Sequence, residues 1–84
     1  MDITFKLFAT LTDYLPPAAR RSNALNMEVD DDLTVKQLID LFAMPEKLVH
    51  LVLVNGTYIA PEDRAEKVLK DGDVLAVWPP VAGG

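Results

Sequence analysis

The chain has 84 residues, half of them apolar and a quarter charged, so we expect one globular domain near the lower size limit for a single core. It has no cysteine, which excludes disulfides and thiolate metal sites, and its net charge of −5 argues against binding nucleic acid. No apolar run approaches the ~20 residues that span a bilayer. No basic stretch followed by an apolar block marks a secretory signal. We therefore expect a cytoplasmic protein that binds no membrane.

The first third of the chain is predicted to form two strands. Residues 2–8 alternate between apolar and polar side chains, and residues 25–29 do the same, so the two segments are expected to pair as a hairpin. Between them, residues 9–24 contain two adjacent prolines and two adjacent arginines. This composition is typical of a short helical turn followed by a loop.

A helix is predicted to begin after Thr34. Thr34 and Gln37 have the spacing of a capping box, in which each side chain accepts a hydrogen bond from the other residue's backbone N–H. Pro45 is expected to end the helix at or before Met44. The acidic run at 30–32 is interpreted as a solvated turn whose charge favours the helix N-terminus, rather than as a cation site. The apolar face of the helix is expected to comprise Val35, Leu38, Ile39 and Phe42.

The last third of the chain is predicted to add three strands. Residues 51–54 are continuously apolar, which indicates a strand buried on both faces. Asn55-Gly56 predicts a hairpin that returns through residues 57–59, and a loop or single helical turn covers residues 61–70. A turn at residues 71–73 leads into the final strand, residues 74–78.

This order of elements predicts an α+β fold of the β-grasp (ubiquitin-like) type. Two strands, one main helix and three further strands would form a mixed sheet with the helix packed across it, and the final strand would lie beside the first. We expect residues 1–78 to be the β-grasp domain and residues 79–84 to be an extended, flexible Gly-Gly tail.

The sequence lacks the combinations of residues that are typical of catalytic sites. His50 is the only histidine, and Ser22, the only serine, lies far from it along the chain. One histidine without cysteine cannot form a typical zinc site or a Cys/His nucleophilic pair. Gly56 and Gly72 are isolated turn glycines, so there is no phosphate-binding loop. We therefore expect no bound metal or cofactor, and a chain that is not an enzyme by itself.

The carboxyl-terminal residues carry the clearest functional pattern. Adjacent prolines favour a stiff, extended stalk, and adjacent glycines can pass a channel too narrow for side chains. Six extended residues span roughly 20 Å. The pattern predicts a tail that delivers its terminal carboxylate into another protein, formed by Pro79, Pro80, Val81, Ala82, Gly83 and Gly84.

Three aromatic residues are predicted to lie on the side of the sheet away from the core. If the alternating apolar residues of 2–8 face the core, Phe8 faces outward. The alternation within their own strands places Tyr58 and Trp78 outward as well. Exposed apolar patches often mark docking sites, and aromatic residues are favoured there. We expect the sheet to bring Phe8, Tyr58 and Trp78 together near the root of the tail, and they are the candidate partner-binding residues.

With these residues placed, the chain resembles the ubiquitin-like sulfur carriers. It resembles the molybdopterin synthase small subunit more closely than the thiazole-synthesis carrier. The likeness spans the full length in layout, and its specific parts are the opening Phe5–Ala9 and the block Asp71–Gly84 with its turn, strand, Pro-Pro and Gly-Gly. The segment Leu15–Ala24 looks longer than in compact members, which would suit a different large subunit or a related metal–pterin pathway using molybdenum or tungsten.

The resemblance implies a mechanism and partners. A ubiquitin-activating-like enzyme would use ATP to adenylate Gly84, and a persulfide donor would convert the product into a thiocarboxylate. Docking would use Phe8, Tyr58 and Trp78. As the small subunit of molybdopterin synthase, the chain would then pass sulfur to a pterin held by the large subunit, forming the dithiolene of the molybdenum cofactor. The alternatives are sulfur delivery to thiamine, cysteine or tRNA, a modifier that joins Gly84 to lysines, and a plain β-grasp binding module.

Overall fold

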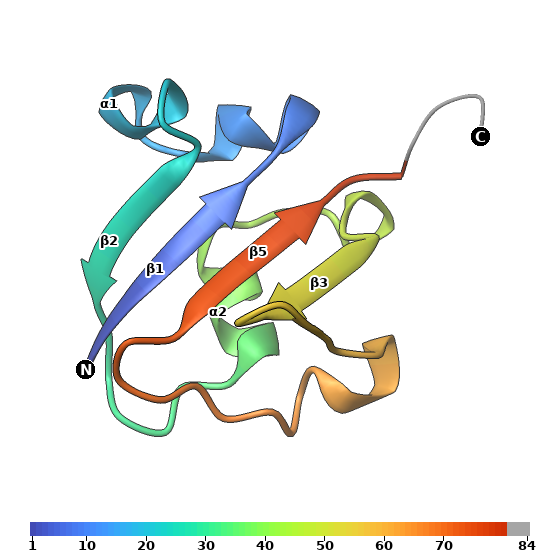
Figure 1. Ribbon diagram of the computed structural model, residues 1–84. Coiled ribbons are helices and arrows are strands. Elements are labelled where there is room, and N and C mark those ends of the chain that lie inside the picture. The colour runs from blue at the N-terminus through green and yellow to red at the C-terminus, as the bar shows by residue number, and fades with distance from the viewer. Residues whose placement is uncertain (81–84) are drawn as a thin grey trace.

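Five strands form one mixed sheet in the computed structural model, which describes residues 1–80 (Figure 1). Their order across the sheet is β2-β1-β5-β3-β4. The central pair, β1 and β5, is parallel, and the other neighbours are antiparallel. This arrangement confirms the predicted β-grasp. The strands are β1 Asp2–Leu7, β2 Ala24–Glu28, β3 Leu51–Val54, β4 Thr57–Tyr58 and β5 Val74–Trp78.

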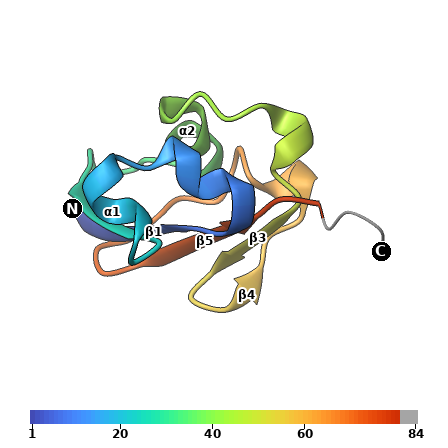
Figure 2. The ribbon, with the colours of Figure 1, turned by 90° about the horizontal axis from the view of Figure 1, so that it is seen from above.

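Helical segments cover one face of the sheet and leave the other face open (Figure 2). On the covered face, the parallel register sets Phe5 beside Leu75 and Leu7 beside Val77, and all four side chains are fully buried. Burial of such apolar side chains is the main driving force of folding. The core therefore lies between the centre of the sheet and the main helix.

The main helix, α2 (Val35–Leu41), begins as predicted. The Gln37 backbone N–H donates to Thr34 Oγ1 at 3.2 Å, and the Thr34 N–H donates to Gln37 Oε1 at 2.9 Å. This reciprocal pair satisfies two of the N–H groups that a helix start leaves without partners. Phe42, just beyond the helix, packs its ring against Phe5 with the centroids 4.7 Å apart. The helix ends before Pro45, as expected.

Short helical turns connect the other elements; those within residues 9–24 and 61–70 were predicted, whereas the one after Pro45 was not. They are η1 Ala9–Tyr14, α1 Pro17–Arg20, η2 Glu46–Leu48 and η3 Pro61–Asp63. The β3–β4 hairpin turns at Asn55 and Gly56, whose φ angles of 51° and 83° lie in the left-handed region that glycine and asparagine tolerate. No helix within residues 1–80 is long and apolar enough to cross a membrane.

One expectation about β3 was wrong. Its apolar run predicted burial on both faces, but only Val52 and Val54 are buried, whereas Leu51 and Leu53 are partly exposed. The physical reason is that the helices pack on the face of Val52 and Val54 alone. Leu51 and Leu53 therefore contribute to the open face of the sheet.

Candidate docking surface at the root of the tail

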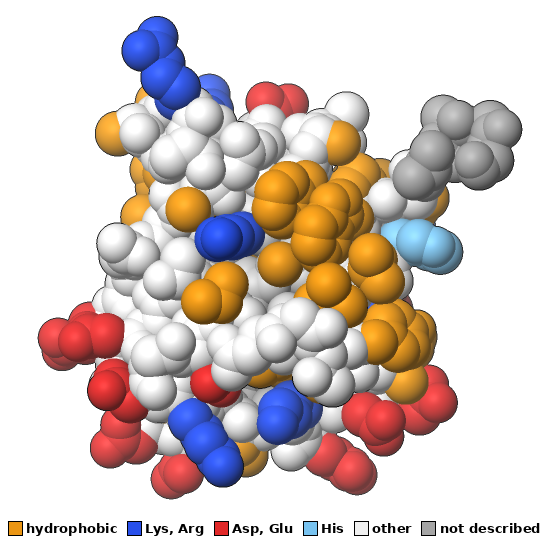
Figure 3. All heavy atoms as spheres, in the orientation of Figure 1, with side chains coloured by type: hydrophobic (Ala, Val, Ile, Leu, Met, Phe, Trp, Pro, Cys, Tyr) orange, Lys and Arg blue, Asp and Glu red, His pale blue; other side chains and the backbone are white. Residues whose placement is uncertain are grey.

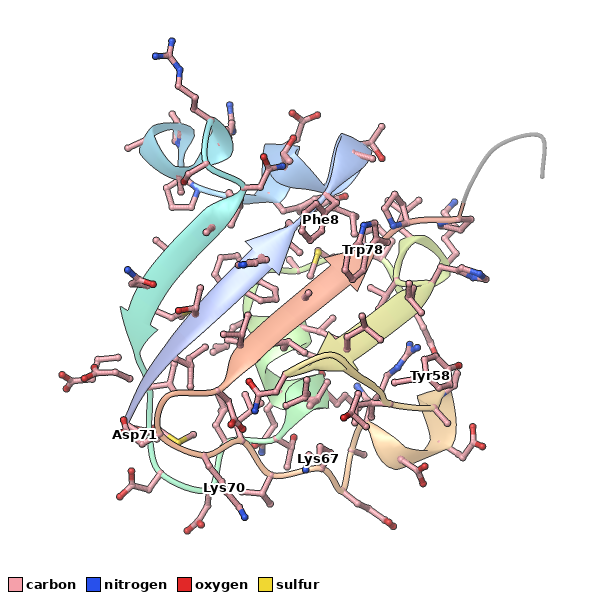
Figure 4. The ribbon with its side chains drawn as sticks, viewed as in Figure 1. Phe8, Tyr58, Lys67, Lys70, Asp71 and Trp78 are labelled. Atoms are coloured by element: carbon pink, nitrogen blue, oxygen red, sulfur yellow. The ribbon has the colours of Figure 1, made fainter. Side chains whose placement is uncertain are left out.

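An aromatic stack lies where β1 and β5 end. Phe8 follows β1 and Trp78 is the last residue of β5, and their rings are nearly parallel, with centroids 4.3 Å apart and planes inclined by 4° (Figure 4). Both side chains are partly exposed. The predicted outward direction of these two residues is confirmed, and the structure adds that they contact each other.

Tyr58 lies on the same face but apart from the stack. It pairs with Leu53, which in turn pairs with Ala76 on β5, so two strand spacings, roughly 10 Å, separate Tyr58 from β5. Its side chain is 54% exposed, and Figure 4 shows it well away from Phe8 and Trp78. The three aromatics share a face, but the expectation that they come together near the root of the tail was wrong for Tyr58, because β3 lies between β4 and β5.

Apolar side chains fill the space between the stack and Tyr58. Leu51 lies opposite Trp78, and Leu53 lies opposite Ala76. Figure 3 shows hydrophobic side chains gathered over β5 and β3 on this face. Sequence reasoning missed these residues because all four residues of β3 are apolar, so the strand has no polar alternation to show which face lies open. We call this set the open-face surface: Phe8, Leu51, Leu53, Tyr58, Ala76 and Trp78.

The end of β5 is held from both sides. The Phe8 N–H donates to the Val77 carbonyl at 3.2 Å, and the His50 N–H donates to the Trp78 carbonyl at 3.0 Å. Pro79 is buried and Pro80 is exposed, so the chain leaves the domain directly beside the aromatic stack. The remaining predicted tail residues, Val81, Ala82, Gly83 and Gly84, lie outside the described residues.

A buried arginine supports this corner of the domain. Arg64 is 8% exposed, and its guanidinium donates to the carbonyls of Ile59 at 3.3 Å, Val49 at 3.4 Å and His50 at 3.1 Å. It thereby ties the segment after η3 to the start of β3, and His50 in turn holds Trp78. Nothing in the sequence marks this role, because an isolated arginine in a polar loop normally lies in solvent.

The open-face surface is the candidate site within the described residues. No group of three metal-ligating side chains lies close together within residues 1–80. His50 acts through its backbone N–H and carbonyl, while the residue is exposed. This part of the chain can therefore present an apolar surface beside an emerging tail.

The family model described as Mut7-C ubiquitin matches residues 1–83. The chain belongs to the Mut7-C ubiquitin family. No protein of curated function matches it. Among solved structures, the Haloferax volcanii HVO 2177 protein is 31% identical to this chain, with a TM-score of 0.72, covering 100% of this chain and 87% of that one.

Two further solved structures resemble this chain over the full length of both compared chains. SAMP1 from Haloferax volcanii is 28% identical, with a TM-score of 0.71 and 100% of each chain covered. A chain of the complex of subunits 1 and 2 of molybdopterin-converting factor from Helicobacter pylori is 24% identical, with a TM-score of 0.60 and 100% of each chain covered. At that identity the second likeness shows the fold alone. The predicted resemblance to the ubiquitin-like sulfur-carrier family is confirmed by the family model and by the shared fold.

Proposed function

We propose that this protein is a sulfur carrier for molybdopterin synthesis whose Gly84 is converted into a thiocarboxylate. The observation that carries the proposal is the placement of the open-face surface beside the point where the chain leaves the domain. A partner that covers the Phe8–Trp78 stack also receives the tail. The choice of pathway rests on the resemblance of residues 71–84 to the molybdopterin synthase small subunit, and a chain of a molybdopterin-converting factor complex shares the fold.

The open-face surface suits repeated, reversible docking. Its stacked rings are held in place before binding, so less side-chain freedom is lost when a partner covers them. Aromatic anchors surrounded by aliphatic side chains are favoured at interface centres. The same surface would serve two partners in turn, an adenylating enzyme related to ubiquitin-activating enzymes and the large subunit of molybdopterin synthase.

The tail would need activation before it can carry sulfur. A terminal carboxylate has a pKa of about 3.5 and is ionised and weakly electrophilic at neutral pH. The adenylating enzyme would join it to AMP from ATP and release pyrophosphate. The outer sulfur of a donor persulfide would then attack the acyl carbon and displace AMP, and a donor thiol would cleave the acyl disulfide to leave the thiocarboxylate. The chain has no cysteine of its own to carry sulfur.

The reach of the tail follows from where it begins. Because Pro79 is buried, five residues from Pro80 to Gly84 remain, which span at most about 18 Å when extended. The reacting atom of the partner would therefore lie within that distance of the tail root. In this proposal the protein acts as a carrier rather than an enzyme, it binds no cofactor itself, and it works in the cytoplasm.

A modifier role is the second candidate. It is favoured by the 28% identity to SAMP1, known in another of its structures as small archaeal modifier protein 1. The same adenylated Gly84 would be attacked by a lysine amine instead of a persulfide. Isopeptide-linked conjugates in cells would identify this role, whereas a thiocarboxylate on the free protein identifies sulfur carriage.

The first test is the intact mass of the protein purified from its own cells, followed by sequencing of its C-terminal fragment. We expect one sulfur in place of one oxygen at Gly84. The Gly83→Leu variant is expected to fold normally and to stay unmodified, because a leucine side chain blocks a narrow channel. A wild-type tail that stays unmodified with adenylating enzyme, ATP and persulfide donor would contradict sulfur carriage.

A further inference from the structure

One cation lies beside the open-face surface. Lys6 is on β1, two positions before Phe8, so its side chain is on the same face of the sheet. In register it lies between Ala76 on β5 and Ala24 on β2, and its side chain is partly buried. Figure 3 shows a basic side chain next to the hydrophobic side chains on this face, with most acidic side chains toward the lower margin.

The neighbours of Lys6 on this face carry no charge. Thr4 and Phe8 flank it along β1, and alanines flank it across the sheet. The ion pairs formed within residues 1–80 join the N-terminal ammonium to Asp31 and Lys36 to Asp40, so Lys6 has no carboxylate partner in the described part of the chain. A protein of net charge −5 thus presents an uncompensated positive charge at its apolar surface.

We propose that Lys6 selects the partner of the open-face surface, and that this partner places a carboxylate against it within an otherwise apolar contact. The inference rests on the proposed function, in which the partner is an adenylating enzyme. An apolar partner surface would remove water from the Lys6 ammonium without compensation, which is unfavourable. A facing carboxylate compensates the ammonium for the lost water. Only partner surfaces with a negative charge at that position would then bind well.

The test uses ATP–pyrophosphate exchange by the adenylating enzyme encoded in the same genome, with this protein as the varied substrate. Lys6→Glu is compared with Lys70→Glu, which changes the charge equally at an exposed lysine that Figure 4 places at the other end of the sheet. We expect Lys6→Glu to raise KM by about tenfold or more with kcat unchanged, and Lys70→Glu to leave KM within about twofold.

A second variant separates charge from packing. Lys6→Met keeps the aliphatic stem, so its KM is expected to rise less than that of Lys6→Glu. The KM of the wild type should increase with salt concentration, whereas the KM of Lys6→Met should not. A carbodiimide, which joins amines directly to carboxylates, should link Lys6 of the wild type to the enzyme. Circular dichroism confirms the fold of each variant.

The outcomes distinguish the two proposals. Exchange with equal KM for Lys6→Glu and Lys70→Glu, or the same salt dependence for wild type and Lys6→Met, overturns the role of Lys6 and leaves sulfur carriage standing. No exchange with the wild-type protein refutes the carrier function, and the inference with it.

Discussion

Replacing Arg64 by methionine is expected to lower the free energy of unfolding by about 3 kcal/mol. The guanidinium makes three hydrogen bonds to main-chain carbonyls, at 3.1, 3.3 and 3.4 Å. The short bond is counted at about 1.5 kcal/mol and each long one at about half of that. Methionine fills similar space but offers the carbonyls no donor. For a domain of this size the loss corresponds to a fall in Tm of about 12 to 24 °C.

The assay follows Trp78 fluorescence during guanidinium chloride unfolding. Trp78 is the only tryptophan, and its ring lies in the aromatic stack, so its signal reports the corner that Arg64 supports. The matched control is Arg21→Met, at an exposed arginine, which should change stability by less than about 0.5 kcal/mol. The denaturant slope m is expected to stay unchanged in both variants.

Two results would refute the reasoning about Arg64. One is an unfolding free energy for Arg64→Met that equals that of Arg21→Met. The other comes from hydrogen exchange: the His50 amide, which donates to Trp78, should lose more protection in Arg64→Met than the Leu38 amide in α2. Equal loss at both amides would mean that Arg64 supports the whole domain rather than the root of the tail.

Three further changes have defined outcomes. Thr34→Ala removes the capping box and should cost about 1 kcal/mol of unfolding free energy, measured by urea titration. Phe8→Ala should leave the fold intact but weaken binding to the adenylating enzyme at least tenfold by calorimetry, roughly the effect of losing an interface anchor that stacks on Trp78. A hydrogen bond to Asp40 and its charge raise the pKa of Lys36 above the ordinary 10.5. This small stabilisation is complete below pH 10.5 and is lost as pH rises through the raised pKa of Lys36, so the urea midpoints of wild type and Asp40→Asn should converge once Lys36 is deprotonated in the folded protein.

Local signals in the sequence were sufficient for the order and kind of the main elements. The capping box at Thr34 and the hairpin turn at Asn55-Gly56 act over a few residues, so their geometry follows from residue type alone. The alternation in residues 2–8 likewise separated core residues from Phe8 on the outer face. With the elements known, few topologies place one helix across such a sheet, and the β-grasp followed.

The composition of the docking surface was decided only by the tertiary structure. The contact of Phe8 with Trp78 joins residues 70 positions apart, and it depends on the parallel register of β1 and β5. The partial exposure of Leu51 depends on which face the helices leave open. Arg64 gains its role only when the carbonyls at the start of β3 converge on it. These features depend on contacts between elements that are distant in sequence, so local sequence propensity cannot predict them.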